Sequence, residues 1–147
     1  MKNLIKVVPH FPKQGIMFQD LTPLMGDVLV FREIVSKMKP ESLYGVPTKV
    51  VGIEARGFIF GAALANELSA PFVPVRKYGK LPRETWSAKY GLEYGSEIVE
   101  IHRDALGKSD KVIIVDDVLA TGGTAIAASS LVEKCGAKVL EIVFLLE

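Results

Sequence analysis

The stretch VIIVDDVLATGGTAIAA, residues 112–128, decides the fold that the sequence predicts. It opens with a continuous apolar run, turns acidic at Asp116 and Asp117, passes through ATGGT and continues into an alanine-rich segment. A continuous run of branched apolar residues is typical of a parallel strand that is covered on both faces. We therefore expect a buried strand over residues 111–115, a ligand-binding loop at its carboxyl end and a helix over residues 124–134.

The segments around this stretch predict alternating strands and helices. Residues 138–146 form a further apolar run, and Gly136 is placed to end the helix before it. Upstream, a strand over 49–53, a helix over 58–68 and a strand over 72–75 predict a first unit of the same kind. Residues 27–38 have the apolar spacing of a helix, with Asp27 as its N-cap. The expected fold class is α/β, with a parallel sheet flanked by helices.

A polar segment, RKYGKLPRETWSAKYGLEYG (76–95), separates the two units. It shows neither the helical nor the strand period of apolar residues. A long polar segment inside a compact domain is either functional, often as a lid, or a disordered linker. Trp86, Tyr90 and Tyr94 favour the lid, because linkers contain few aromatic residues. A half-exposed strand is expected to follow over 97–103.

The composition limits the class of protein. A chain of 147 residues with 49% hydrophobic residues predicts a single domain over 1–147, and a net charge of +1 gives no basic surface for nucleic acid. The single cysteine, Cys135, excludes an internal disulfide and indicates a reducing compartment. No apolar run reaches the roughly 20 residues of a membrane span, and the first residues lack a secretory signal pattern. We expect a cytoplasmic protein with no membrane or nucleic-acid partner.

The loop ATGGT is suited to bind a phosphate. It leads into a helix N-terminus, where free backbone N–H groups favour an anion. Gly122 and Gly123 allow positive φ and a close approach of the backbone, and Thr121 and Thr124 add hydroxyl donors. The preceding carboxylates can accept hydrogen bonds from a vicinal diol. Together these groups indicate a ribose 5-phosphate; the alternative is an acidic strand end whose carboxylates only cap the helix.

The segment VIIVDDVLATGGTA resembles the phosphoribosyl pyrophosphate (PRPP) motif of type I phosphoribosyltransferases. Four more segments resemble the adenine phosphoribosyltransferase family, in the same order: FPKQGIMFQDLTPL (11–24), GIEARGFIFG (52–61), VPVRKYGKLPRET (73–85) and YGLEYG (90–95). The resemblance implies transfer of the 5-phosphoribosyl group of PRPP to N9 of adenine, giving AMP and pyrophosphate in purine salvage. It also implies a small N-terminal hood and a flexible catalytic loop.

The resemblance assigns a PRPP site. The loop 120–124 would hold the 5-phosphate, and the paired aspartates the ribose hydroxyls. Arg56 would bind the pyrophosphate through its planar fork, after a cis peptide bond between Glu54 and Ala55; taken alone, it would be a surface ion-pairing arginine. Arg76, Lys77 and Lys80 are candidates to bind the leaving pyrophosphate, and some of them would reach it across a dimer interface. The implied PRPP set is Arg56, Arg76, Lys77, Lys80, Asp116, Asp117, Ala120, Thr121, Gly122, Gly123 and Thr124.

The implied catalytic residues are Arg56 and Glu93. Glu93 resembles the residue that handles a proton at adenine N7, and Tyr94 would close the loop and exclude water. The alternative for Glu93 is a solvated glutamate on a mobile loop.

The implied base site combines two parts of the chain. Phe18 would stack on adenine and Val118 would pack on its other face, while the backbone of Met17 and Gln19 would read its edge. Taken alone, Phe18 would be a core aromatic. Gln19 stands where many relatives have arginine, so the base preference depends on whether only its backbone is used.

The resemblance further implies Mg²⁺ and a homodimer. The ion would contact PRPP and water near Asp116 and Asp117, with no direct protein ligand. The chain ends at FLLE, so a shortened C-terminal segment is expected. Two other functions stay open: transfer to another base such as guanine or xanthine, and a non-catalytic PRPP-binding regulator.

Overall fold

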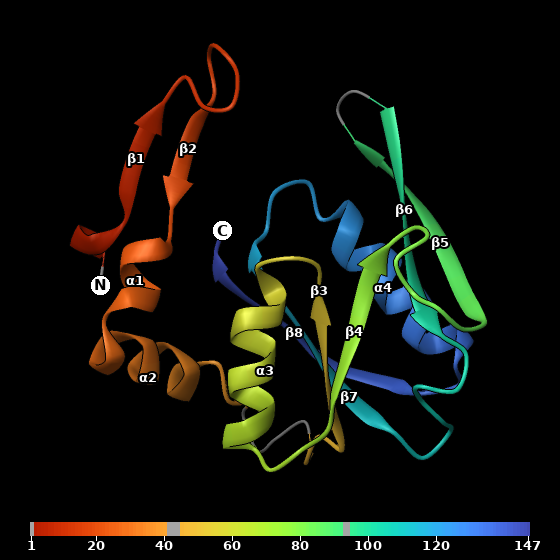
Figure 1. Cartoon of the computed structure of the whole chain (residues 1–147). Coiled ribbons are helices and arrows are strands. Elements are labelled where there is room, and N and C mark those ends of the chain that lie inside the picture. Colours follow the sequence, from red (N-terminus) through yellow and green to blue (C-terminus); the bar gives the residue numbers. More distant parts are fainter. Residues whose placement is uncertain (1, 41–44, 93–94) are drawn as a thin grey trace. The chain divides into compact units, whose positions relative to one another are not determined.

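The computed structural model describes residues 2–40, 45–92 and 95–147, and the chain divides into two compact units (Figure 1). The first unit, Met1–Lys37, holds a short 3-10 helix at Lys2–Leu4 and an antiparallel hairpin in which Lys6 pairs with Asp20 and Pro9 with Met17. Its remaining elements are β1 (Lys6–Pro9), β2 (Met17–Asp20), α1 (Thr22–Gly26) and α2 (Val28–Lys37).

An aspartate side chain accepts hydrogen bonds near the start of each α-helix of the first unit. Asp27 Oδ1 accepts hydrogen bonds from the backbone N–H groups of Leu29 (2.9 Å) and Val30 (3.1 Å), which confirms the predicted N-cap. Asp20 Oδ1 accepts from the backbone N–H of Thr22 (2.9 Å) and from its hydroxyl (2.7 Å). The hairpin and α1 have no counterpart among the predicted elements, because strands of four residues and a helix of five are too short to show a period.

The second unit, Met38–Glu147, holds a six-stranded sheet in the order β5-β6-β4-β3-β7-β8. Strands β4, β3, β7 and β8 are parallel to one another. Strands β6 and β5 extend the sheet beyond β4 and are antiparallel to their neighbours. The α/β class and the parallel centre of the sheet are thereby confirmed. The elements are β3 (Lys49–Ile53), α3 (Gly57–Glu67), β4 (Phe72–Lys77), β5 (Thr85–Leu92), β6 (Gly95–His102), β7 (Lys111–Val118), α4 (Gly123–Lys134) and β8 (Lys138–Leu146).

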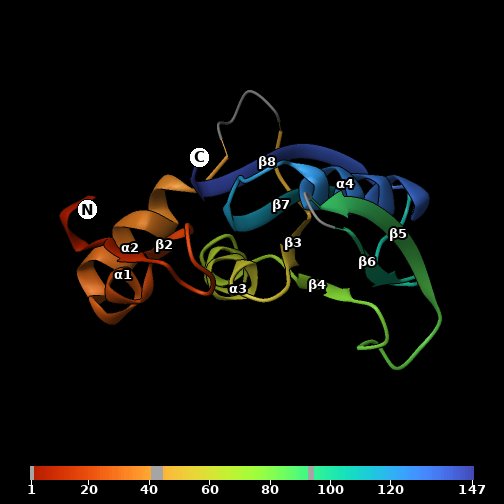
Figure 2. The same cartoon turned by 90° about the horizontal axis from the view of Figure 1, so that it is seen from above.

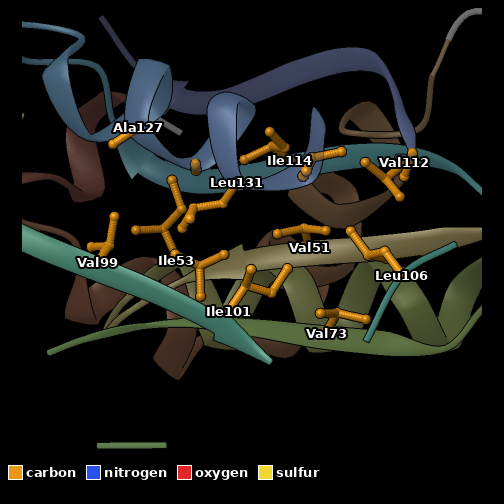
Figure 3. Close-up of a cluster of buried hydrophobic side chains, with 14 residues drawn as sticks. Val51, Ile53, Val73, Val99, Ile101, Leu106, Val112, Ile114, Ala127 and Leu131 are labelled. Carbon is orange, nitrogen blue, oxygen red and sulfur yellow. The ribbon is translucent and has the colours of Figure 1, made fainter. Parts of the chain in front are cut away.

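Helices α3 and α4 cover opposite faces of this sheet (Figure 2). α3 packs against β3, β4 and β7, whereas α4 contacts β5, β6, β7 and β8, because the antiparallel strands curl toward it. The main apolar core lies between the sheet and α4 (Figure 3). Its fully buried members include Val51, Ile101, Ile114 and Leu131. Gly136, at φ 84°, ends α4 as predicted.

The interpretation that residues 76–95 show no strand period is wrong for residues 85–92. The described part of this segment contains β5, which pairs with β6 along its whole length, from Thr85 opposite His102 to Leu92 opposite Gly95. Trp86, Ala88 and Tyr90 alternate toward the core. Two of these three inward residues are aromatic. In the sequence their aromatic character favours a lid, and in the structure they form the packed face of a strand.

Within the described residues, the structure has no helix of the length and apolar character that crossing a membrane requires.

Candidate functional site

The described predicted site residues of the second unit lie at, or directly after, the carboxyl ends of three parallel strands. β3, β4 and β7 are neighbours in register, so the segments after them begin at the same edge of the sheet (Figure 1). In open α/β sheets, ligands bind at this edge. The segments are residues 54–57 after β3, 76–80 at the end of β4, and 116–124 at the end of β7.

An ion pair joins the first and third of these segments. Arg56 Nε lies 2.6 Å from Asp117 Oδ2, and the Asp117 residue is only 4% exposed. Apart from this ion pair the oxygen makes no hydrogen bond within the described residues, and a carboxylate oxygen that contacts one cation can still accept from a ligand hydroxyl. The peptide bond between Glu54 and Ala55 is cis, as predicted. The ion pair thus connects the segment around Arg56 with the segment around Asp117, which are far apart in the sequence.

Gly57 brings the turn after β3 directly onto β7. A Cβ atom at this position would lie 2.7 Å from the Val115 carbonyl oxygen and 3.0 Å from Asp116 Oδ1. Only glycine allows the backbone this approach. Arg56, the residue before it, is therefore held beside the two aspartates.

The two aspartates lie inside β7 rather than after it. The prediction that the strand ends at residue 115 is wrong, because β7 continues to Val118, with Asp116 opposite Phe144 and Val118 opposite Leu146 of β8. Asp116 Oδ1 accepts a hydrogen bond from the backbone N–H of Asp117 at 2.9 Å. Burial, together with the neighbouring Asp117 charge, raises the pKa of Asp116 to about 7.

This raised pKa predicts a pH-dependent stability. The ordinary pKa of the carboxyl is 3.8, so between about 4 and about 7 the folded chain keeps a proton that the unfolded chain has lost. The free energy of unfolding should therefore fall as the pH rises through this window, by at most about 1.4 kcal/mol per pH unit. Urea denaturation at pH values from about 5 to about 8 measures it.

Asp116→Asn is the control for this prediction, because asparagine keeps the shape and cannot titrate. It should flatten the slope between pH 5 and 7, and an equally steep slope in the variant would assign the effect to another group. The carboxyls with lowered pKa, which include Glu54, Glu97, Asp104 and Asp110, lose their stabilising contribution only at lower pH.

The loop of residues 120–124 opens α4. Gly122 has φ 76°, a left-handed conformation, and is the N-cap of the helix without a side-chain hydrogen bond. The first N–H groups of α4 have no partner within an α-helix and suit an anion. Tyr90 of β5 lies against this loop, because the Thr124 side chain is within its hydrogen-bonding reach and a Cβ at Gly123 would lie 3.3 Å from its ring.

Each of the three cations predicted to bind the leaving group forms an ion pair with a carboxylate. Arg76 Nε lies 3.3 Å from Glu54 Oε2, and Lys80 Nζ forms an ion pair with the same carboxylate. Lys77 Nζ lies 3.2 Å from Glu97. Burial pushes the pKa of Glu54 up, but hydrogen bonds from Lys80, Lys77 and Arg76 outweigh it and leave the pKa lowered.

Three residues at this edge are absent from the predicted site. Glu54 directly follows a buried strand, which is the same signal that singled out Asp116. Glu97 accepts a hydrogen bond from the Tyr90 hydroxyl at 2.8 Å, and these two residues face each other in the register of β5 and β6. No pattern in the sequence reveals that pair before the register is known.

The residues predicted to bind the base divide between the two units. Met17, Phe18 and Gln19 lie on β2 of the first unit, where the Phe18 ring meets that of Phe11 edge to face, with centroids 5.1 Å apart. Val118 is the last residue of β7 in the second unit. Glu93 and Tyr94 lie outside the described residues.

No group of three or more histidine, cysteine, aspartate or glutamate side chains that could hold a metal ion exists in the described parts of the chain. The oxygen donors at the site are the carboxylates of Asp116 and Asp117, which suit a hard cation that keeps most of its water.

Comparison with known proteins identifies close relatives. The model of a family described as "Phosphoribosyl transferase domain" matches residues 29–147. A curated protein of Francisella tularensis subsp. novicida, named adenine phosphoribosyltransferase, is 54% identical over 149 residues, which cover 100% of this chain and 85% of the relative.

Solved structures agree with this similarity. Adenine phosphoribosyltransferase from Thermoanaerobacter pseudethanolicus is 48% identical with a TM-score of 0.92, covering 98% of this chain and 84% of the other. The enzyme from Saccharomyces cerevisiae, complexed with an imino-altritol bisphosphate and adenine, is 43% identical with a TM-score of 0.93, covering 99% and 85%.

Proposed function

The chain belongs to the adenine phosphoribosyltransferases of the phosphoribosyltransferase family, and we propose that the groups at its sheet edge bind PRPP for transfer to adenine. The reaction joins N9 of adenine to C1 of the ribose and releases pyrophosphate. The observation that carries the proposal is the ion pair between Arg56 and Asp117, which unites a pyrophosphate motif with a ribose motif.

The parts of PRPP are divided among the three segments. The residues of the loop, Ala120, Thr121, Gly122, Gly123 and Thr124, bind the 5-phosphate at the start of α4. Asp116 and Asp117 accept hydrogen bonds from the ribose hydroxyls; the buried Asp117 Oδ2, which pairs with Arg56 but makes no hydrogen bond within the described residues, supports this. Arg56, Arg76, Lys77 and Lys80 bind the pyrophosphate.

This division suits the charges that develop during transfer. As the bond from C1 to the pyrophosphate breaks, positive charge builds on the ribose and negative charge on the leaving group. Carboxylates beside the ribose and cations beside the pyrophosphate stabilise both. Arg56, paired with Asp117, stands where these two sets meet and is proposed as a catalytic residue.

Phe18 is proposed to stack on the base and the backbone of Met17 and Gln19 to read its edge, and Val118 is proposed as a further residue that contacts the base. Glu93 would hold a proton at adenine N7, and Tyr94 would exclude water during transfer.

Mg²⁺ is proposed to bind near Asp116 and Asp117, mainly through water and PRPP oxygens, where its charge would offset that of the diphosphate. A homodimer, a cytoplasmic location and a single functional domain over 1–147 complete the proposal.

The decisive experiment incubates the purified chain with PRPP, Mg²⁺ and one base at a time. We expect AMP from adenine, and no GMP, XMP or OMP from guanine, xanthine or orotate. Formation of one of these nucleotides instead would assign another base. PRPP binding without pyrophosphate release from any base would favour the non-catalytic regulator.

Glu93→Gln should lower kcat by about 10²-fold, because glutamine cannot exchange the proton at N7. The KM values for PRPP and adenine should change little. Steady-state rates measure this, with Glu33→Gln, which removes a surface pair with Lys37 on α2, as the matched control. Normal turnover by Glu93→Gln would end its proposed role.

A further inference from the structure

Glu54 is a buried carboxylate that holds several donors of the site at once. Its side chain is 7% exposed. Oε2 accepts from the backbone N–H of Lys77 at 2.9 Å and from Arg76 Nε at 3.3 Å, while Oε1 accepts from Lys80 Nζ and from Arg76 Nη2 at 3.5 Å. A buried carboxylate is stable only when its oxygens are paired, so these contacts fix the donors as well as the acceptor.

The same short turn also presents Arg56. Glu54 and Arg56 are separated by one residue, and Arg56 pairs with Asp117 on β7. The turn therefore binds β4 through Glu54 and β7 through Arg56. The position of Arg76 and Lys80 relative to Arg56 follows from this arrangement.

A second buried carboxylate fixes the other side of the loop after β4. Glu100 of β6 is 5% exposed and accepts from the backbone N–H of Gly79 at 2.9 Å and from the Thr85 hydroxyl at 3.0 Å. Arg76 Nη1 in turn donates to the Lys80 carbonyl at 3.1 Å. The segment that carries Arg76 and Lys80 is thus anchored from β3 and from β6.

The pairing with Glu54 leaves Arg76 and Lys80 able to bind an anion. A guanidinium and an ammonium each have several N–H donors, and Glu54 with the Lys80 carbonyl uses only part of them. The two side chains remain 34% and 47% exposed. A diphosphate can therefore be bound while both cations keep their contact with Glu54.

We propose that Glu54 is a positioning residue for the transferase reaction. It holds Arg76 and Lys80 in fixed positions relative to Arg56, so that the three cations bind one diphosphate together. This inference rests on the proposed function. It predicts that the Glu54 side chain governs the pyrophosphate end of PRPP, while the 5-phosphate end depends on the loop at the start of α4.

Glu54→Gln tests this, because it keeps the size of the side chain and removes its charge. The KM for PRPP should rise by about tenfold or more, since misplaced binding groups lose their combined effect. By calorimetry with Mg²⁺, affinity for inorganic pyrophosphate should fall by about the same factor. Affinity for ribose 5-phosphate and the KM for adenine should stay within about twofold.

Two further variants distinguish positioning from simple stability. Glu54→Asp keeps the charge on a side chain one methylene shorter; it should still weaken pyrophosphate binding, though less than Glu54→Gln. Glu67→Gln removes a partly exposed ion pair with Lys39 near the end of α3 and should leave all constants unchanged. Thermal melting of each variant shows whether the protein is folded at the assay temperature.

Unchanged pyrophosphate affinity in folded Glu54→Gln would overturn the inference. Tighter binding would overturn it too, because Glu54 would then compete with the anion. If the wild-type chain formed no AMP, the proposed function would fail, yet calorimetry with pyrophosphate and ribose 5-phosphate would still test Glu54. If AMP formed normally in both proteins, only the inference on Glu54 would fail.

Discussion

Asp117→Asn should lower kcat/KM for PRPP by about 10³-fold, equivalent to about 4 kcal/mol. Asparagine has nearly the same shape, but it cannot balance the Arg56 charge at 2.6 Å, and its side chain has one acceptor oxygen in place of two. The variant therefore loses both the orientation of Arg56 and an acceptor for a ribose hydroxyl. Most of the loss should appear as a higher KM for PRPP in steady-state assays.

Asp27→Asn is the matched control for this change. Asp27 caps α2 in the first unit, and asparagine caps a helix as well as aspartate does, so activity and stability should stay close to wild type. A wild-type KM for PRPP in Asp117→Asn would show that the buried ion pair plays no part in binding, and it would remove the main support for the arrangement of the site.

Gly57→Ala should damage both the fold and the activity. The new Cβ would lie 2.7 Å from the Val115 carbonyl oxygen and 3.1 Å from the Asp116 Cα. These are backbone atoms of a central strand, so no side-chain rotation relieves the contact. We expect the free energy of unfolding to fall by about 2–3 kcal/mol. Because Arg56 moves away from Asp117 with the turn, kcat/KM for PRPP should fall by about 10²-fold.

Urea denaturation and PRPP kinetics on the same preparation measure the two effects of Gly57→Ala. Gly26→Ala is the control, because a Cβ at Gly26 would meet no described atom within 4 Å. It should retain wild-type stability and rates. A Gly57→Ala protein with both properties intact would show that the contact between the turn and β7 relaxes without consequence.

The sequence predicts the centre of this fold well, because its elements have long local patterns. The apolar runs of β3, β7 and β8 are continuous, and Gly122 and Gly136 mark the two ends of α4 by their conformation. β5 is harder to recognise because its inward residues, among them Trp86 and Tyr90, lie in a segment rich in glycine and basic residues that is typical of a loop. The hairpin of the first unit escapes it because its strands are too short to show alternation.

The candidate site likewise has a part that the sequence predicts and a part that it does not. The loop of residues 120–124 and the two aspartates lie within nine residues of sequence, so the chemistry proposed for them can be inferred from the sequence alone. The pairing of Lys80 with Glu54 joins the segments that follow two strands, and that of Tyr90 with Glu97 joins residues on two strands. Both depend on how the strands are placed beside one another. Such contacts are properties of the assembled sheet, and only the three-dimensional arrangement reveals them.

The curl of β5 and β6 around α4 ties phosphate recognition to the hydrophobic core. Leu131 and Ala127 are buried in that core, on the same helix whose first turn is proposed to present its N–H groups to the 5-phosphate. The axis of the helix, and with it the direction of its dipole, is set by apolar packing behind the site. Thermal stability and phosphate affinity therefore depend on shared side chains, so selection or engineering for one of these traits alters the other.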